Sequence, residues 1–492
     1  MRILVSILTL GLLLAPLSGY GDEAFLRAQI EELDLQGTFD GVESSLVVQN
    51  ANTGEVVYSR NEAALFNPAS NAKILSTLAA LSYLTPDFRF KTQLIGGSDR
   101  QDPKKKKKAK QDKSKKMTKV GKDGMVPILT LKGYGDPSFT SYDLEKMVRE
   151  LKKKGVRRVG EVRIDETYFD NTGFPGREDG FRQRLFNVGA FFLDQNQIEV
   201  VVTPGESIGL PATVSLYPPV EPLVCEGEIL TRARGSKVTV RQAFGFQSGL
   251  GLHVSGAVAL GSDPQTFSVP CDEPGKVAGQ RLLVLLRQFG IEAPDRFRFA
   301  PTPDDGKILV ENKSTALKDL LPIINKKSDN FLAEQITKVL GAEYFGQPGS
   351  TRKGVEAIYR ELNATGVDVT GIYLENGSGL SRNSLVKARS LVSSLQKVYD
   401  NPRLREPFIE TLSVLGVDGT LRRRFRNTDF EGRFVGKTGT LNGVSALTGF
   451  AYPITGSGGK LYILSHLING SGKGFWQRKQ MTQKFLELLL SQ

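Results

Sequence analysis

The strand-like segments at the two ends of the chain constrain its fold more than any other feature. Five apolar or alternating runs are typical of β-strands, two near the amino terminus and three near the carboxyl terminus: residues 45–48, 55–58, 434–437, 446–452 and 461–468. The first two predict a hairpin that turns at 50–54, and helical patterns occur at 22–35 and 482–490. If one sheet gathers all five strands, the two ends of the chain lie side by side.

A hydroxyl and an amine stand three residues apart at the head of an apolar helical run. Ser70 and Lys73 would share one face of that helix, because residues at i and i+3 are neighbours. Such a pair suits a nucleophilic serine with a lysine base. The spacing alone is weak evidence, because it recurs at four other pairs: Ser350/Lys353, Ser384/Lys387, Ser394/Lys397 and Ser457/Lys460.

Two further motifs follow Ser70 in a fixed order. Ser328-Asp329-Asn330 opens another helical run, and Lys437-Thr438-Gly439-Thr440 ends a strand-like run. Three motifs in this order are typical of penicillin-binding proteins and serine β-lactamases. With the segments 68–70, 377–382 and 417–421, the chain resembles the D-alanyl-D-alanine carboxypeptidase/endopeptidase family of the penicillin-binding protein 4 type, low-molecular-mass class C and peptidase family S13. The resemblance covers nearly the whole mature chain.

This resemblance implies an α/β fold in which a penicillin-binding domain, an antiparallel sheet flanked by helices, carries two β-rich inserted domains. Ser70 and Ser328 are 258 positions apart but must meet in one cleft, so an insertion is expected between them. Short β-like runs with Gly/Pro turns occupy about residues 92–300. We expect a catalytic domain at 22–91 and 301–492, an inserted domain at 92–204 and 273–300, and a nested domain at 205–272.

The family assigns the acyl-transfer chemistry to residues of the three motifs. Ser70 would be the nucleophile, Lys73 its base, and Ser328 a relay that carries the proton to the leaving amine. Lys73 can act as a base only if part of it is neutral, so we expect burial and the nearby charge of Lys437 to lower its pKa.

The family also assigns the substrate contacts. Asn330 would hold the substrate amide, and a terminal carboxylate would meet Lys437 and the hydroxyls of Thr438 and Thr440. Gly439 would allow close approach, and the backbone N–H groups of Ser70 and Thr440 would bind the oxyanion.

Arg382 and Asp136 match family positions that hold a charged diaminopimelate-type side chain. Each also has an ordinary interpretation. Arg382 could be a surface cation, and Gly135-Asp136-Pro137 is a common turn sequence.

The net charge of +12 is concentrated in one segment. Residues 101–122 hold eleven lysines against Asp102 and Asp112, a net +9, which leaves +3 for the rest. Such a run is most often a solvated loop, and its alternative partner is an anionic wall polymer or membrane surface, contacted through Lys104 to Lys122. Aromatic residues for base stacking are lacking there, so nucleic acid is not expected.

The amino-terminal segment predicts export. Two residues, Met1-Arg2, precede an apolar run from Ile3 to Leu17, a pattern typical of a signal peptide, here residues 1–21. We therefore expect a periplasmic or cell-envelope protein, soluble or peripherally associated.

The cysteines and histidines bear on disulfide formation and on metal binding. In an oxidising compartment the only two cysteines, Cys225 and Cys271, would form a disulfide. His253 and His466 are the only histidines and match no ligand pattern, so neither a metal nor a cofactor is expected.

Three functions remain open from the sequence. The first is a serine D-Ala-D-Ala carboxypeptidase or DD-endopeptidase that acts on peptidoglycan stem peptides and crosslinks and is inhibited covalently by β-lactams. The second is a serine β-lactamase, which shares the first chemical step but releases the acyl group quickly. The third is a non-catalytic wall-binding or β-lactam-sensing protein that has kept the cleft.

Overall fold

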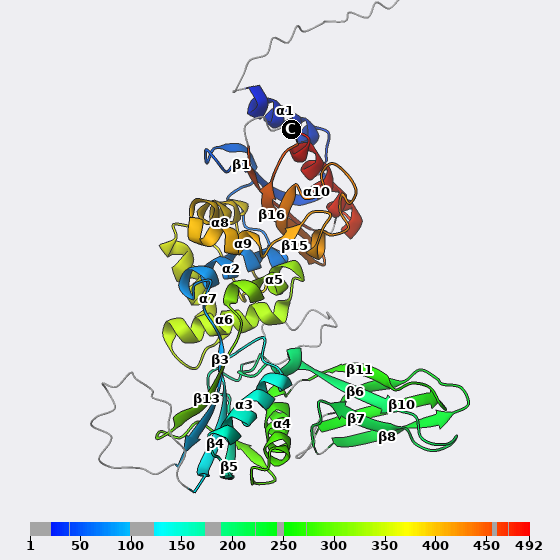
Figure 1. The fold of residues 1–492 in the computed structure, drawn as a ribbon. Coiled ribbons are helices and arrows are strands. Elements are labelled where there is room, and N and C mark those ends of the chain that lie inside the picture. Colours follow the sequence, from blue (N-terminus) through cyan, green and yellow to red (C-terminus); the bar gives the residue numbers. More distant parts are fainter. Residues whose placement is uncertain are drawn as a thin grey trace, which may run out of the picture.

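The computed structural model describes residues 21–38, 40–98, 123–172, 188–221, 223–243, 250–271, 273–454, 460–470 and 472–492. Figure 1 shows an upper body, a lower body and an arm that projects to one side of the lower body. The expected signal peptide, apart from Gly21, and the lysine-rich segment 101–122 lie outside the described residues.

The upper body is built on a six-stranded antiparallel sheet in the order β14-β15-β16-β17-β1-β2. β1 pairs with β17, with Val47 opposite Ser465, so the two ends of the chain lie side by side. All five predicted strands are present, and β14 is additional. Their bounds are β1 Glu43–Asn50, β2 Val56–Arg60, β14 Ser413–Val414, β15 Phe434–Leu441, β16 Val444–Ala451 and β17 Tyr462–Asn469.

Helices cover both faces of this sheet, because alternate strand residues point to opposite sides. On one face, Leu46 and Val48 pack with Phe485 and other residues of α1 and α10. On the other, Val47 and Leu467 belong to a second core shared with the remaining helices. The helices are α1 Gly21–Leu35, α2 Ala72–Tyr83, α5 Leu317–Lys326, α6 Asn330–Phe345, α7 Thr351–Ala364, α8 Ala388–Asp400, α9 Pro402–Ile409 and α10 Phe475–Leu490.

Helix α2 is more deeply buried than its sequence pattern predicts. Its apolar spacing indicates one buried side, but every residue from Ala72 to Leu81 is buried. The reason is that α5, α6, α7, α8 and α9 all contact it. The polar side chains at its start are therefore held in an environment with little water.

The lower body contains a five-stranded sheet in the order β12-β5-β4-β3-β13, with two helices. Helix α3 is not predicted, although Thr140 and Asp143 form a capping box at its start. Strand β13 follows the expected boundary at 301 but pairs with β3. The bounds are β3 Lys91–Gly97, β4 Met125–Gly133, β5 Arg158–Asp165, β12 Phe297–Phe299, β13 Lys307–Lys313, α3 Ser141–Lys153 and α4 Pro274–Gln288.

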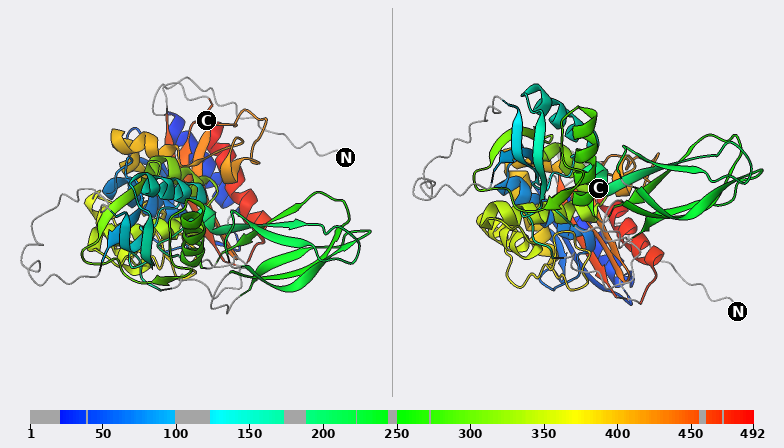
Figure 2. Two further views of the ribbon diagram at one scale, coloured as in Figure 1. Left: turned by 60° about the horizontal axis from the view of Figure 1, so that its bottom comes forward. Right: turned by 90° about the horizontal axis from the view of Figure 1, so that it is seen from below.

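Two three-stranded sheets form the arm, and Figure 2 shows it projecting away from the rest of the molecule. The sheets have the orders β8-β10-β9 and β11-β6-β7 and share a core that includes Val200 and Leu252. A 3-10 turn, η3 (Leu193–Asn196), leads into the arm. The bounds are β6 Gln197–Thr203, β7 Thr213–Tyr217, β8 Leu223–Arg232, β9 Thr239–Ala243, β10 Leu250–Ala259 and β11 Gln265–Pro270.

The predicted disulfide between Cys225 and Cys271 is not present in the structure. Cys225 lies on β8 with an exposed side chain, whereas Cys271 is buried just after β11. The two strands belong to different sheets of the arm.

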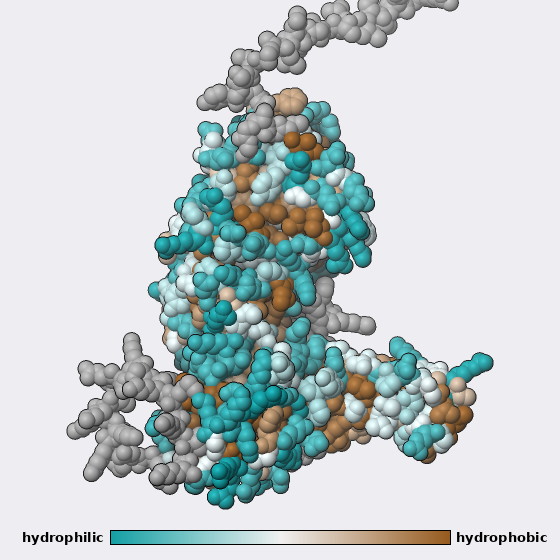
Figure 3. All heavy atoms as spheres, in the orientation of Figure 1, coloured by the Kyte–Doolittle hydropathy of each residue, from teal (hydrophilic) through white to brown (hydrophobic). Residues whose placement is uncertain are grey.

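The surface is mostly hydrophilic on the face shown in Figure 3, with apolar patches on the upper body and at the free end of the arm. Ile208, Leu210 and Leu260 are among the exposed apolar residues. Their turns meet through backbone bonds from Gly209 to Thr231 and from Leu260 to Arg232. Within the described residues, no helix has the length and apolar character needed to cross a bilayer.

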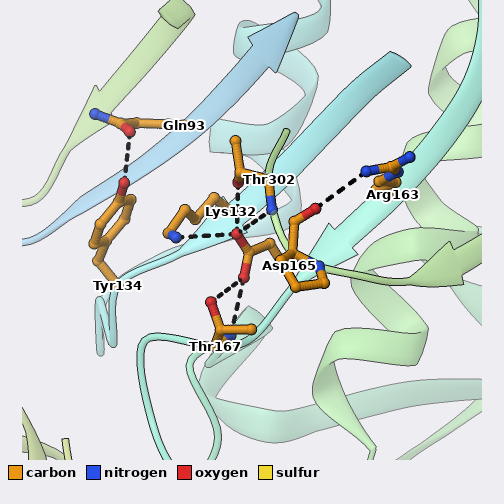
Figure 4. A network of polar contacts seen from close by, with 8 residues as sticks. Gln93, Lys132, Tyr134, Arg163, Asp165, Thr167 and Thr302 are labelled. Carbon is orange, nitrogen blue, oxygen red and sulfur yellow. Dashed lines mark hydrogen bonds and ion pairs between the residues drawn. The ribbon is translucent and has the colours of Figure 1, made fainter. Parts of the chain in front are cut away.

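A buried carboxylate ties the lower body together, as Figure 4 shows. Asp165, at the end of β5, accepts hydrogen bonds from Lys132 Nζ at 3.0 Å and from the hydroxyls of Thr167 and Thr302 at 2.6 and 2.5 Å. The backbone N–H groups of both threonines add two more bonds. Burial alone would raise the pKa of Asp165, but these bonds lower it to about 2.

We expect Asp165→Asn to destabilise the protein, because an amide NH2 would then face these donors. At neutral pH the loss should be about 3 kcal/mol. Part of it depends on pH. The pKa of Asp165 lies below its ordinary 3.8, so its stabilising effect is complete above about pH 4 and is lost as the pH falls toward 2.

Thermal unfolding across this pH range provides the measurement. The exposed Asp304 lies in the same turn region as Thr302, so Asp304→Asn is a matched control that should change stability by less than about 0.5 kcal/mol. Equal stability of the two variants at pH 7 would show that the Asp165 network does not support the fold.

Candidate active site

Ser70 lies in a short 3-10 turn, η1 (Ala69–Asn71), immediately before α2. The turn is held in an unusual conformation, because Ala69 has φ +44° and its N–H donates to Asn67 Oδ1 at 2.8 Å. Left-handed backbone at a residue other than glycine is costly and is often found at functional sites. Ser70 is partly exposed, whereas its neighbours Ala69 and Asn71 are buried.

Lys73 lies one turn further on, fully buried, and its ammonium makes three hydrogen bonds. Nζ donates to Ser70 Oγ at 3.2 Å, to Asn330 Oδ1 at 2.7 Å and to the carbonyl oxygen of Ser378 at 2.7 Å. The predicted contact between Ser70 and Lys73 is therefore present in the structure. The same ammonium also joins the first motif to the second.

The second motif forms the turn between α5 and α6. Asp329 caps α6 by accepting from the Leu332 N–H at 2.9 Å. Ser328 is left-handed at φ +58°, and its hydroxyl is free of this capping task. Instead, Ser328 Oγ accepts from Lys437 Nζ at 2.9 Å.

The third motif lies on β15, where Lys437 is fully buried and also donates to the Thr438 carbonyl at 2.7 Å. Thr438 Oγ1 donates to Thr420 Oγ1 at 2.8 Å. Gly439 permits contact with η1, because a Cβ there would lie 2.7 Å from the Pro68 carbonyl oxygen. The prediction that glycine is needed for close approach has this physical basis.

Burial controls the electrostatics of both lysines. It lowers the pKa of Lys73 to about 7, against the opposing charges of Glu334 and Asp329. It also lowers the pKa of Lys437 well below its usual range, and the charge of Lys73 adds to this shift. The expected cation effect thus acts on Lys437, whereas burial accounts for the lowered pKa of Lys73.

Asp136 lies in the β4–α3 loop, whose next four residues line a cleft of about 540 Å³. Asp329 and Lys327 line it from the α5–α6 turn. The Asp136 carboxylate is buried and accepts from the N–H and hydroxyl of Ser138 at 2.9 and 2.7 Å. Burial raises its pKa.

Arg382 and Thr440 lie near the end of β15. The exposed Arg382 donates from Nη1 to the Asn442 carbonyl at 3.1 Å. Thr440 is also exposed and, with Asn442 and Lys473, lines a second hollow of about 360 Å³. The structure therefore brings Arg382 to the hairpin that carries the third motif.

Three residues of this site were missed from the sequence. Ser378 supplies a carbonyl to Lys73, Glu334 accepts the Ser378 N–H at 2.7 Å, and Thr420 supports Thr438 from the turn η4 (Gly419–Leu421). Ser378 and Thr420 lie in segments that carried the family resemblance. Glu334 follows Asn330 by four residues and so shares its helix face, which was the available signal.

The arrangement has the parts that acyl transfer requires. The partly exposed hydroxyl of Ser70 is hydrogen-bonded to the amine of Lys73. The pKa of Lys73 is about 7, so a fraction of this amine is neutral and can accept a proton at neutral pH. A second hydroxyl, on Ser328, is bonded to a second amine.

Comparisons with known proteins show the family of this chain. The model of the D-Ala-D-Ala carboxypeptidase 3 (S13) family matches residues 26–487. A D-alanyl-D-alanine carboxypeptidase of Actinomadura sp. (strain R39) is 31% identical over 86% of this chain and 78% of its own. The carboxypeptidase DacB of Haemophilus influenzae is 25% identical over 89% and 88%.

Solved structures show the same fold. The crystal structure of penicillin-binding protein 4 from H. influenzae has a TM-score of 0.72 at 23% identity and covers 93% of this chain and 99% of its own. A complex of that protein with a β-lactam has a TM-score of 0.66 at 23% identity, covering 93% and 98%. The chain thus belongs to the D-Ala-D-Ala carboxypeptidase 3 (S13) family of peptidases.

Proposed function

We propose that this chain is a serine D-Ala-D-Ala carboxypeptidase, DD-endopeptidase or both, which cleaves peptidoglycan peptides through an acyl-enzyme on Ser70 and is inhibited covalently by β-lactams. The main support is the pair of buried lysines. Lys73 donates hydrogen bonds to Ser70 and Asn330, and Lys437 donates one to Ser328. Family membership and the β-lactam complex of the related protein support the same activity.

In the first step, Ser70 Oγ attacks the carbonyl carbon of the penultimate D-Ala and gives its proton to Lys73. The peptide C–N bond then breaks, and the leaving amine takes a proton through Ser328 and the lysines. Water next attacks the ester, which releases the shortened peptide and restores the Ser70 hydroxyl. The N–H groups of Ser70 and Thr440 would stabilise the oxyanion in both steps.

The substrate contacts follow from the same arrangement. A terminal carboxylate would bind Lys437 and the hydroxyls of Thr438 and Thr440, and Asn330 would hold the amide before the scissile bond. Gly439 keeps β15 against η1. These contacts favour peptide substrates that end in a free carboxylate. Peptidoglycan stem peptides are the substrates that the family's activity indicates.

Arg382 and Asp136 are proposed to hold the charged side chain of the stem peptide. Arg382 lies at the hairpin after Thr440, and Asp136 immediately precedes the wall of the 540 Å³ cleft. Asp136 Oδ2 is buried without a hydrogen bond in the described part of the chain, so a substrate ammonium could supply one.

We also propose the division into a catalytic domain (22–91, 301–492), an inserted domain (92–204, 273–300) and a nested domain (205–272). The separate sheets of the two bodies and the arm support this division. Two strands depart from its bounds: β13 pairs with β3 in the sheet of the lower body, and β6 pairs with β7 and β11 in the arm. Export is proposed from residues 1–21, and amino-terminal sequencing of the exported protein should begin at Asp22.

Labelling with penicillin tests the function directly. Ser70→Ala should abolish labelling and peptide cleavage without unfolding, because alanine is tolerated in helical turns. Ser350→Ala is the matched control: Ser350 has the same spacing to a lysine, but its Oγ only caps α7. That variant should label normally and lose about 1 kcal/mol of stability. Label that persists in Ser70→Ala would overturn the assignment.

The time course of the label distinguishes the alternatives. A lasting acyl-enzyme is expected here, whereas rapid release would indicate a β-lactamase. Labelled protein that cleaves no defined muropeptide would indicate a β-lactam sensor.

Arg382→Lys should lower kcat/KM for peptides with a diaminopimelate-type side chain. The expected loss of transition-state stabilisation is about 2 kcal/mol, because lysine cannot form two parallel hydrogen bonds to a carboxylate. Acylation by simple penicillins, which lack that group, should change little. Comparable losses with both ligands would mean that Arg382 only supports the hairpin through Asn442.

The lysine-rich segment 101–122 is proposed to contact an anionic wall polymer or membrane surface. Deleting residues 101–122 should weaken binding to isolated sacculi and leave turnover of a small D-Ala-D-Ala peptide unchanged. A variant with all eleven lysines replaced by glutamine controls for length and should behave like the deletion. Undiminished binding in both variants would contradict this role.

A further inference from the structure

Glu334 is a fully buried carboxylate next to the proposed catalytic groups. It follows Asn330 by one helical turn on α6, so both side chains point to the same side. Its Oε1 accepts from the Ser378 N–H at 2.7 Å. Its Oε2 is buried and receives no hydrogen bond from the described residues. Burying a carboxylate with one unsatisfied oxygen destabilises the fold, so its presence here needs a functional explanation.

Ser378 connects this carboxylate to Lys73. The N–H of Ser378 donates to Glu334, and its carbonyl accepts from Lys73 Nζ at 2.7 Å. Gly377 and Gly379, on either side of Ser378, let this turn pack closely against both α6 and η1. A Cβ at Gly377 would lie 1.8 Å from Thr337 Oγ1, and one at Gly379 would lie 1.9 Å from the Ala69 carbonyl oxygen. A shift of Glu334 would therefore be passed to Lys73.

The charged groups around Glu334 are mostly cationic. Lys73 faces it from α2, and Lys338 acts on it from one turn further along α6. Burial raises the pKa of Glu334 to about 7, although hydrogen bonding by Ser378 and both ammonium groups oppose the shift. The charge of Asp329 also raises the pKa of Lys73, and the charge of Lys73 lowers the pKa of Lys437. Near neutral pH the charges of Glu334 and Lys73 therefore depend on each other.

We propose that Glu334 is a positioning residue for Lys73, which it holds beside Ser70 through Ser378 and whose positive charge it balances during acylation. The inference rests on the proposed function. When Ser70 Oγ bonds to the substrate carbonyl, its proton moves to Lys73 Nζ. The buried ammonium formed in this step is then stabilised by the carboxylate. Glu334 does not touch the reacting atoms and acts only through Lys73 and Ser378.

Glu334→Gln separates the charge from the hydrogen bond, because an amide oxygen can still accept the Ser378 N–H. Without the carboxylate, the pKa of Lys73 falls further, and a larger fraction is neutral at low pH. The acid limb of the penicillin acylation rate constant should therefore move to lower pH by about one unit. The plateau should fall roughly tenfold, because the new ammonium has lost its countercharge and Lys73 is a weaker base.

Two further variants complete the test. Glu343→Gln makes the same change on the same helix at an exposed carboxylate that accepts from Tyr168, and it should leave both limb and plateau as in the wild type. Glu334→Asp keeps the charge but shortens its reach, so the plateau should fall while the limb stays within about 0.3 units of the wild type. The Asp variant also serves if the Gln variant does not fold.

The outcomes are distinct. A Glu334→Gln variant with a lower plateau and an unmoved limb would reduce Glu334 to a structural support, and an unchanged profile would also overturn the proposal. An Asp variant with an unchanged plateau would contradict positioning through Ser378. Failure of the proposed function itself would appear earlier, as wild-type protein that penicillin does not label at Ser70.

Discussion

The site depends on keeping two ammonium groups, those of Lys73 and Lys437, together and away from water. Removing such a charge from water costs several kcal/mol unless polar groups replace the lost hydration. The structure supplies Ser70, Asn330 and the Ser378 carbonyl to Lys73, and Ser328 and the Thr438 carbonyl to Lys437. These neutral acceptors offset only part of the lost hydration, so burial still lowers the pKa values of Lys73 and Lys437. The chemistry of the serine thus follows from incomplete compensation of burial.

This arrangement requires three distant segments to meet without a gap. The turn η1 comes from the first part of the chain, the α5–α6 turn from its middle and β15 from near its end. Close backbone contacts fix them, with Gly439 against Pro68 and Gly379 against Ala69. Five helices, α5 to α9, surround α2 and exclude water from its side chains, and the lower body lies below α6 in Figure 1.

Much of the fold and most of the site could be predicted, because short-range patterns carry them. Hydrophobic alternation located the strands of the main sheet, and the order of the motifs located Ser70, Lys73, Ser328 and Lys437. Apart from the gathering of the terminal strands into one sheet, specific contacts between residues far apart in the sequence could not be predicted. The left-handed Ala69 and the hydrogen bond between Glu334 and Ser378 are both set by tertiary contacts. Local composition does not encode such contacts, and a resemblance transfers only what its motifs contain.

The pairing of β1 with β17 has a consequence for how the protein folds. β1 (Glu43–Asn50) pairs along its whole length with β17 (Tyr462–Asn469), so the main sheet cannot close until almost the whole chain has been made. Contacts of such sequence separation form slowly. The lower body and arm are made entirely from earlier residues and can fold first. The candidate active site, which needs β15 of the main sheet, is therefore completed last, after the rest of the chain is synthesised.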